Sequence, residues 1–128
     1  MNILLDTHIL LWAASDTLPP SAAKYILDES NDLYFSAASI WEVAIKQGLN
    51  RPDFDADPHL LYTALISNGY NELSITSEHT LLTGTLPMIH KDPFDRVIIA
   101  QSIKEGMTLL SFDDVVATYP APVILVKK

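Results

Sequence analysis

The sequence predicts an α/β fold, a three-layer α/β/α sandwich around a central parallel sheet of four or five strands. Short strand-like segments alternate with segments of helical length along the 128 residues, which is the pattern of repeated βαβ units. Right-handed crossovers place the helices on both faces of such a sheet. With 48% hydrophobic residues and no Cys, the chain is expected to form a single domain, residues 1–128, around a core without disulfides.

Each predicted strand is short, and is either apolar or rich in residue types that favour sheets. The first is apolar and ends abruptly at Asp6. In parallel sheets, ligands bind beyond the carboxyl ends of the strands, near the point where the strand order reverses, so functional residues are sought there. The predicted strands cover, in order, residues 3–5, 33–35, 72–75, 108–111 and 123–126.

The predicted helices are recognised by the residues that start and end them. Pro19 and Pro20 open the second helix, since proline suits a first turn, and Asp92-Pro93 opens the last one. Gly48 and Gly106 end the third and the last helix, because glycine is favoured at helix ends. The helices cover, in order, residues 7–14, 21–27, 36–48 or 37–48, 58–67, 77–82 and 93–105, and residues 51–58 form a polar loop.

The charge balance is acidic, with 16 Asp and Glu residues against 8 Lys and Arg and a net charge of −8. Nucleic-acid binders are usually basic, so this balance argues against such a ligand unless bound divalent cations reverse the local field. No basic segment precedes Asp6, and no apolar stretch approaches the roughly 20 residues that span a bilayer. We therefore expect a cytoplasmic protein without membrane contact.

Two aspartates follow predicted strands. Asp6 directly follows the first strand, and Asp113 lies two residues beyond Ser111, which ends the fourth. Both are therefore expected at the carboxyl edge of the sheet. An aspartate before a helix is also a good N-cap, worth about 1 kcal/mol, so position alone leaves both interpretations open.

Glu42 lies in a helical stretch that leaves little purely polar surface. An i,i+4 ion pair with Lys46 would make it an ordinary surface glutamate, with a contribution of about 0.3–0.5 kcal/mol. A buried glutamate instead needs a partner, a raised pKa or a metal ion. Both interpretations of Glu42 remain open.

Asp92 and Asp95 stand at the start of the last helix. Asp92 is adequately explained as the N-cap, so it supports a site indirectly at most. Asp95 is favoured at its position by the helix dipole, yet it shares a stripe with Ile98, Ile99 and Ser102 and therefore faces inward.

The argument for chemistry rests on the set of carboxylates rather than on any one of them. Clustered carboxylates repel one another, and hard cations relieve that repulsion. Oxygen ligands without Cys favour Mg²⁺ or Mn²⁺, ions that activate water and stabilise the leaving oxygen in phosphodiester hydrolysis. The set comes from two strand ends and two helices: Asp6, Glu42, Asp95 and Asp113.

Four blocks of the sequence resemble the PIN-domain nucleases, and most closely the VapC-type toxins of bacterial type II toxin–antitoxin systems. The resemblance covers essentially the whole chain, in the family's order and spacing. The blocks are Asp6-Thr7-His8, Ser39-Ile40-Trp41-Glu42 with Lys46, His90 to Arg96 with Ala100-Gln101, and Leu110-Ser111-Phe112-Asp113.

The resemblance implies a PIN fold and a Mg²⁺- or Mn²⁺-dependent ribonuclease that leaves a 5′-phosphate and a 3′-hydroxyl. It implies that Asp6, Asp95 and Asp113 hold the metal and that Glu42 assists directly or through water. Thr7 and Ser39 fall where the family places hydroxyls, and Ser111 stands where Thr is more usual. The expected partners are RNA, a VapB-type antitoxin and a second copy of the chain. Three basic residues are expected to offset phosphate charge: Lys46, Lys91 and Arg96.

Two other classes of protein compete with the nuclease. A receiver-like signalling module also places carboxylates at strand ends, with a hydroxyl and a lysine such as Ser111 and Lys127 on later strands, but it needs a carboxylate pair where Asp6 stands alone. A non-catalytic binding domain would use the acids only as caps. The four His residues lack paired metal spacing, and most are expected to be exposed or hydrogen-bonded.

Overall fold

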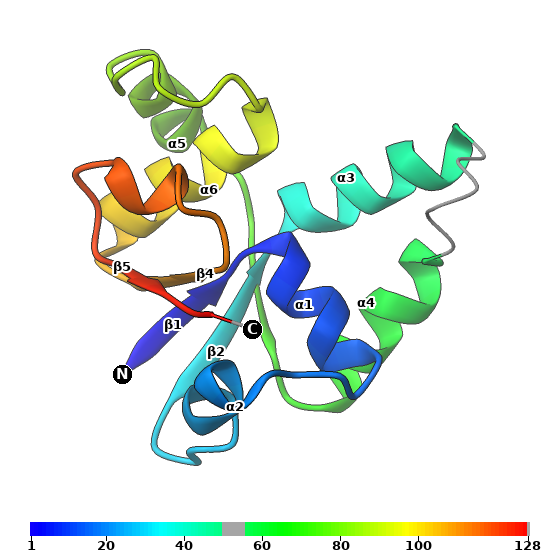
Figure 1. Ribbon diagram of the computed structural model, residues 1–128. Coiled ribbons are helices and arrows are strands. Elements are labelled where there is room, and N and C mark those ends of the chain that lie inside the picture. The colour runs from blue at the N-terminus through cyan, green and yellow to red at the C-terminus, as the bar shows by residue number, and fades with distance from the viewer. Residues whose placement is uncertain (50–55, 128) are drawn as a thin grey trace.

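A computed structural model of the chain describes residues 1–49 and 56–127 and contains one parallel sheet of five strands (Figure 1). The strand order is β3-β2-β1-β4-β5, and every neighbouring pair is parallel. The strands are β1 (Asn2–Leu5), β2 (Asp32–Ser36), β3 (Asn71–Leu73), β4 (Thr108–Ser111) and β5 (Val123–Leu125).

The helices connect successive strands as a doubly wound fold requires. They begin and end close to the predicted positions: the third, fourth and last end at Gly48, Ser67 and Glu105. The helices are α1 (Thr7–Ala14), α2 (Pro20–Ile26), α3 (Ala37–Gly48), α4 (Pro58–Ser67), α5 (Ser77–Thr83) and α6 (Pro93–Glu105).

Three features differ from the prediction. Strand β3 ends at Leu73, so Ser74 and Ile75 lie beyond it, and β5 stops one residue early at Leu125. A short 3₁₀ helix, η1 (Val116–Thr118), forms where no element was expected, because a single turn leaves no periodic pattern in the sequence. The predicted loop over residues 51–58 lies mostly outside the described residues.

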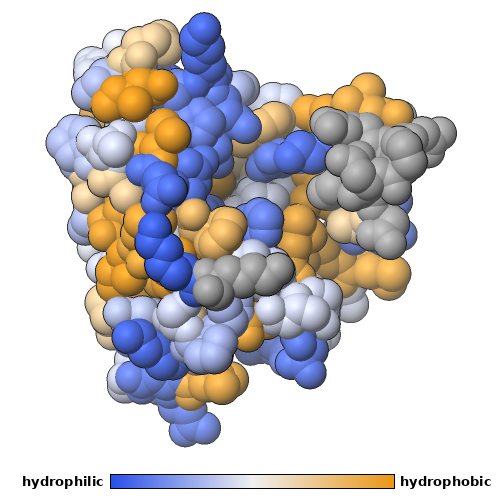
Figure 2. Space-filling model, viewed as in Figure 1, coloured by the Kyte–Doolittle hydropathy of each residue, from blue (hydrophilic) through white to orange (hydrophobic). Residues whose placement is uncertain are grey.

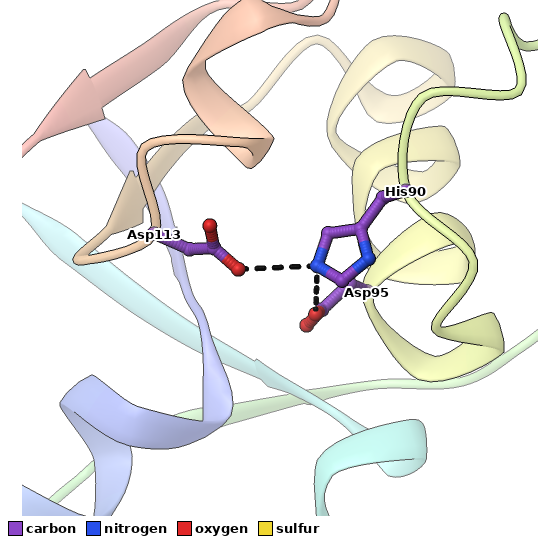
Figure 3. Close-up of side chains that lie close together, drawn as sticks. All are labelled: His90, Asp95 and Asp113. Atoms are coloured by element: carbon purple, nitrogen blue, oxygen red, sulfur yellow. Dashed lines mark hydrogen bonds and ion pairs between the residues drawn. The ribbon is translucent and has the colours of Figure 1, made fainter.

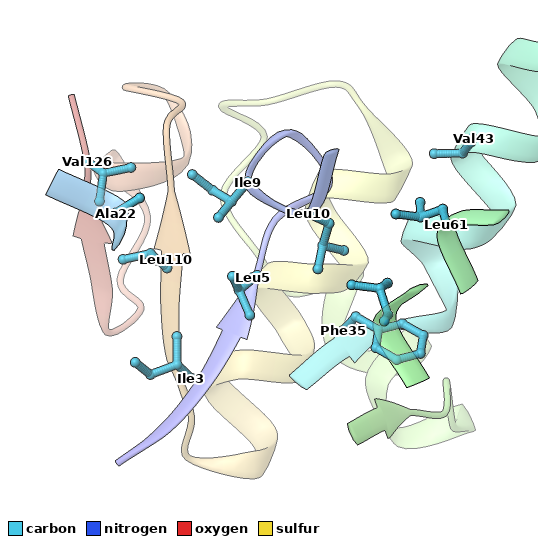
Figure 4. Close-up of a cluster of buried hydrophobic side chains, with 11 residues drawn as sticks. Ile3, Leu5, Ile9, Leu10, Ala22, Phe35, Val43, Leu61, Leu110 and Val126 are labelled. Carbon is cyan, nitrogen blue, oxygen red and sulfur yellow. The ribbon is translucent and has the colours of Figure 1, made fainter. Parts of the chain in front are cut away.

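Two apolar layers hold the sandwich together, one on each face of the sheet. Alternate residues of β1 point to opposite faces: Ile3 and Leu5 pack beneath α1, α2 and α4, whereas Leu4 packs against α6. Figure 4 shows the first layer, in which Leu5, Leu10 and Phe35 are completely buried. The predicted three-layer architecture is therefore confirmed.

The strand order reverses between β1 and β4. The chain winds from β1 outward to β2 and β3, and then returns to place β4 on the other side of β1. Ligands bind at such a switch point, outside the carboxyl ends of the strands. The loops that follow β1 and β4 begin with Asp6 and Phe112, so these segments border the switch point.

The last helix has a defined start and end. Asp92 Oδ1 accepts hydrogen bonds from the backbone N–H groups of Phe94 and Asp95, and Gly106 ends the helix with a left-handed φ of 68°. A side chain at position 106 would be strained there, so glycine suits it. In the part of the chain that the structure describes, none of the helices has the length and apolar character needed to cross a membrane.

Candidate active site

A cleft of about 670 Å³ opens at the carboxyl edge of the sheet. Figure 2 shows hydrophilic side chains gathered around the hollow between α3 and the segment that follows β4. Seven of the residues singled out from the sequence line the cleft: Asp6, Thr7, Glu42, Lys46, Asp92, Asp95 and Asp113.

Asp6 is the most deeply anchored of these carboxylates. Its Oδ1 accepts from the backbone N–H of Ile9 at 2.9 Å and so caps α1, while its Oδ2 accepts from the Ser111 hydroxyl at 2.6 Å. The N–H of Phe112 adds a bond of 3.1 Å to Oδ2. Burial raises the pKa of Asp6, and these hydrogen bonds oppose the rise. The carboxylate therefore joins β1, α1 and β4 at the switch point.

Glu42 is buried, with 6% of its surface exposed, and both its oxygens are engaged. Oε1 accepts from the Thr7 hydroxyl at 2.8 Å, and Oε2 accepts from Lys46 Nζ at 2.8 Å. The Thr7 oxygen also lies 2.9 Å from Ser39 Oγ. The i,i+4 pair with Lys46 is thus present, but on a glutamate that faces the cleft rather than solvent.

Asp95 faces the cleft from the first turn of α6. Burial, followed by the nearby negative charges of Asp92, Glu42 and Asp6, raises the pKa of Asp95 to about 7, and His90 opposes this shift. Asp92 serves as the N-cap, as predicted. Burial is the main cause of the raised pKa of Asp95, and the added effect of three nearby carboxylates indicates that the cleft favours a positive charge.

His90 bridges the two sides of the cleft (Figure 3). Its Nε2 lies 2.9 Å from Asp95 Oδ2 and 3.1 Å from Asp113 Oδ2. Its Nδ1 accepts from the backbone N–H of Asp92 at 3.2 Å, which leaves Nε2 to carry the ring hydrogen. One hydrogen cannot satisfy both carboxylates, so His90 only partly relieves their repulsion.

Sequence reasoning gave His90 no part in the site, because no paired spacing surrounds it. Two signals pointed to it: its place two residues before the helix cap at Asp92, and its place at the start of one of the four blocks that resemble the PIN-domain nucleases. Asp113 also caps the backbone that follows it, since its Oδ1 accepts from Val115 N–H at 2.8 Å. Ser111 lies behind the cleft, completely buried, and its hydroxyl connects Asp6 to the backbone N–H of Asp113.

Arg96 is predicted to offset phosphate charge near the site, but it does not line the cleft. Arg96 is buried, and its guanidinium donates to the carbonyl groups of Thr83, at 2.6 Å, and Pro87, at 2.9 Å. It also donates to the Tyr119 hydroxyl at 3.2 Å. Lys91 is exposed and lines a separate apolar cavity beside Trp41, so of the three predicted basic residues only Lys46 lines the acidic cleft.

The donor set of the cleft fits a hard divalent cation. One oxygen of Asp95, one oxygen of Asp113 and one ring nitrogen of His90 lie within 4.8 Å of one another. Asp6 and Glu42 add carboxylates that raise the pKa of Asp95. Oxygen ligands of this kind suit Mg²⁺ or Mn²⁺, and a bound cation would relieve the repulsion that His90 only partly offsets.

The protein is an α/β protein with a doubly wound sheet, and clustered carboxylates at the switch point of the sheet form an acidic, hydrolase-like site. The chain belongs to the PIN domain family, whose model matches residues 3–121. Metal-dependent RNA cleavage is the general activity of that family. The family resemblance inferred from the sequence is confirmed.

Solved structures show the same fold at low sequence identity. The chain matches VapBC2 from Rickettsia felis bound to a promoter DNA fragment, with a TM-score of 0.71 and 18% identity over 98% of each chain. It matches DNA-bound VapBC from Salmonella typhimurium, with a TM-score of 0.68 and 12% identity over 97% of each chain. It also matches a toxin–antitoxin complex from Klebsiella pneumoniae, with a TM-score of 0.67 and 18% identity over 95% of each chain. No curated protein matches the chain in sequence.

Proposed function

We propose that this chain is a Mg²⁺- or Mn²⁺-dependent endoribonuclease, the VapC-type toxin of a type II toxin–antitoxin pair. The observation that carries the proposal is the convergence of four carboxylates on one cleft in a member of the PIN family. Asp6 and Asp113 follow neighbouring strands, and Glu42 and Asp95 come from α3 and α6.

In this proposal Asp6, Asp95 and Asp113 hold the metal, and Glu42 assists directly or through water. A bound cation would supply a positive charge that activates water and stabilises the leaving oxygen of the RNA backbone. Ser111 holds Asp6 by its 2.6 Å hydrogen bond, and Thr7 holds Glu42 at 2.8 Å. Ser39 supports Thr7 from α3. These contacts fix the carboxylates before substrate arrives, so little rearrangement is needed.

Lys46 is the basic residue best placed to approach a phosphate, because it lines the cleft beside Glu42. Its side chain is 38% exposed, which leaves room for an oxygen of the RNA backbone. Lys91 would act farther along the RNA, since it lines a different cavity.

The solved structures of VapBC and toxin–antitoxin complexes that share this fold support the proposed partners. We infer a VapB-type antitoxin that covers the acidic cleft, and an RNA substrate in the cytoplasm. We also infer a homodimer. Exposed apolar side chains on α3, such as Trp41 and Ile45, offer a surface for the second copy. Light scattering of the purified chain tests the dimer.

The deciding experiment measures Mn²⁺ binding and RNA cleavage on the same preparations. Millimolar Mn²⁺ should raise the melting temperature of the wild type, and Asp6→Asn should reduce that rise. Cleavage should require the metal and disappear in Asp95→Asn, whereas the matched Asp92→Asn variant should retain much of it, because Asn caps a helix almost as well as Asp. If the wild type showed no saturable Mn²⁺ binding, the carboxylates would act only as helix and turn caps, and the proposal would be refuted.

A further inference from the structure

Three aromatic rings gather beside the acidic cleft. The rings of His8 and Phe112 lie 5.3 Å apart at an interplanar angle of 37°. Trp12 stands edge-on to both, with ring centroids 4.4 Å from His8 and 4.8 Å from Phe112. Trp12 thus supports the other two rings, which are themselves part of the wall of the cleft.

The two wall rings are placed by the same backbone that places the carboxylates. His8 follows Asp6 by two residues, and Phe112 directly precedes Asp113. The backbone N–H of Phe112 donates to Asp6 Oδ2 at 3.1 Å, so the ring and the carboxylates are held as one unit. Any group that lies on these rings is therefore beside the proposed metal centre.

Packing explains only part of this arrangement. Phe112 is half-buried and contacts the apolar layer under α1, but His8 is exposed. Among the described residues, the ring contacts of His8 are with Trp12 and Phe112, and its charge also acts on the Asp6 carboxylate. An exposed imidazole that is held against a phenyl ring offers a flat, mainly apolar face to a ligand.

The charge of the cleft limits which part of an RNA can bind there without help from a metal. Phosphates are repelled by the carboxylates, and among the predicted basic residues only Lys46 lines the cleft. Stacking of a base on an aromatic ring does not depend on charge, and it is available only to an unpaired base. A stacking contact would thus contribute to the affinity for RNA, to which the net charge of −8 does not contribute.

We propose that His8 and Phe112 form a stacking platform for one unpaired nucleobase of the RNA, next to the phosphate that is cleaved. The proposal rests on the proposed nuclease function and specifies its substrate class as single-stranded RNA with a base at that position. It predicts that base identity matters little there and that base presence matters, because every base has a π face.

The test uses a single-stranded oligoribonucleotide that the wild type cleaves, with the base removed at each position in turn. One position beside the cleavage site should show a loss in kcat/KM of about tenfold, mainly through KM. Phe112→Leu and His8→Leu should abolish the penalty at that position only, and Phe112→Tyr should restore it. Tyr62→Leu removes an exposed aromatic residue of α4 outside the cleft and should leave the penalty unchanged.

Two further readouts separate stacking from damage to the fold or the metal site. The Mn²⁺ dissociation constant should differ little between Phe112→Leu and the wild type, and the melting temperature should fall by only a few degrees, because Phe112 also packs against the apolar layer. In a Trp41→Phe background, where Trp12 is the remaining tryptophan, single-stranded RNA should quench the fluorescence and duplex RNA should not.

Each outcome distinguishes this proposal from the nuclease proposal. If the wild type cleaves RNA but the abasic penalty is missing, or persists in Phe112→Leu, the stacking platform is refuted and the nuclease stands. If the wild type neither cleaves nor binds RNA with any divalent metal, both fail. If Phe112→Leu changes only the inhibition by a partner peptide, the rings serve that peptide and the platform is again refuted.

Discussion

At the scale of single residues, capping and a functional role are not alternatives in this protein. Asp92 and Asp113 each bind backbone N–H groups through Oδ1. Asp6 caps α1 through Oδ1 and still lines the cleft. A carboxylate has about four lone-pair sites, so a cap leaves capacity for a cation. Local preference for a cap therefore helps to place the carboxylates where a metal would need them.

The raised pKa of Asp95, about 7 against an ordinary value of 3.8, makes a prediction about stability. Between pH values of about 4 and 7, Asp95 keeps its proton in the folded protein but loses it in the unfolded chain, so the free energy of unfolding falls as pH rises through this range. The variant Asp95→Asn does not titrate, so it does not lose this stability. In a chelating buffer at about pH 8, the variant should melt higher than the wild type by roughly 3–8 °C, and the difference should shrink toward about pH 4. Equal melting temperatures at both values of pH would contradict this.

His90 provides the next prediction, because its Nδ1 accepts a backbone hydrogen bond and its Nε2 therefore acts as a donor. Without the imidazole, Asp95 and Asp113 repel each other more strongly in the metal-free protein. His90→Ala should therefore lower the melting temperature without metal and show a larger rise with Mn²⁺ than the wild type. His90→Gln, which keeps an N–H donor, should lie between the two. A smaller Mn²⁺ effect in both variants would instead make His90 a metal ligand.

At the scale of elements, the segment between α5 and α6 is held from inside by one side chain. Arg96 binds the carbonyl groups of Thr83, Pro87 and His90 and the Tyr119 hydroxyl. Tyr119 in turn accepts from the backbone N–H of His90 at 2.6 Å. The position of His90 in the cleft therefore depends on Arg96, although Arg96 itself does not line the cleft.

Arg96→Ala should therefore damage stability rather than RNA contact. Its loss leaves several buried carbonyl groups without donors, and we expect a destabilisation of about 2–4 kcal/mol, measured by denaturant unfolding. Arg96→Lys should recover little, because an ammonium cannot match the planar set of donors. The exposed Lys91→Ala should change stability by less than about 0.5 kcal/mol. If Arg96→Ala unfolded like the wild type and only weakened RNA binding, the buried role would be wrong.

Some elements and site residues could be predicted from the sequence, and others could not. Helix α3 and helix α6 were predictable because Ser36, Gly48, Asp92 and Gly106 mark their ends. The place of Asp6 followed from the general rule on strand ends. The roles of His90 and Arg96 were not predictable, because they depend on the path of an irregular segment whose carbonyl groups carry no sequence signal. Lys91 and Arg96 flank the site in sequence but point elsewhere.

At the scale of the whole molecule, the negative charge makes the cleft a better target for a basic partner than for RNA. Clustered carboxylates attract guanidinium groups, and charge-assisted hydrogen bonds to Asp6 or Asp95 would compete with a metal. RNA meets the opposite condition, since the net charge of −8 repels its backbone. Inhibition by an arginine-rich antitoxin tail is thus electrostatically favoured over unassisted RNA binding.

A short arginine-rich peptide should therefore inhibit cleavage by the Mn²⁺-loaded protein. Inhibition should weaken as the salt concentration rises from about 50 to about 300 mM, because exposed charge pairs are screened over roughly 8–10 Å. Fluorescence anisotropy of the labelled peptide gives its affinity directly. The Asp6→Asn/Asp95→Asn double variant should bind the peptide more weakly at low salt and show less salt dependence, since two of its target charges are gone. A matched Asp16→Asn/Asp28→Asn variant changes the net charge equally at aspartates outside the cleft lining and should bind like the wild type. Peptide binding that depends only on net charge, with both double variants weakened alike, would show that the cleft carboxylates are not the docking site.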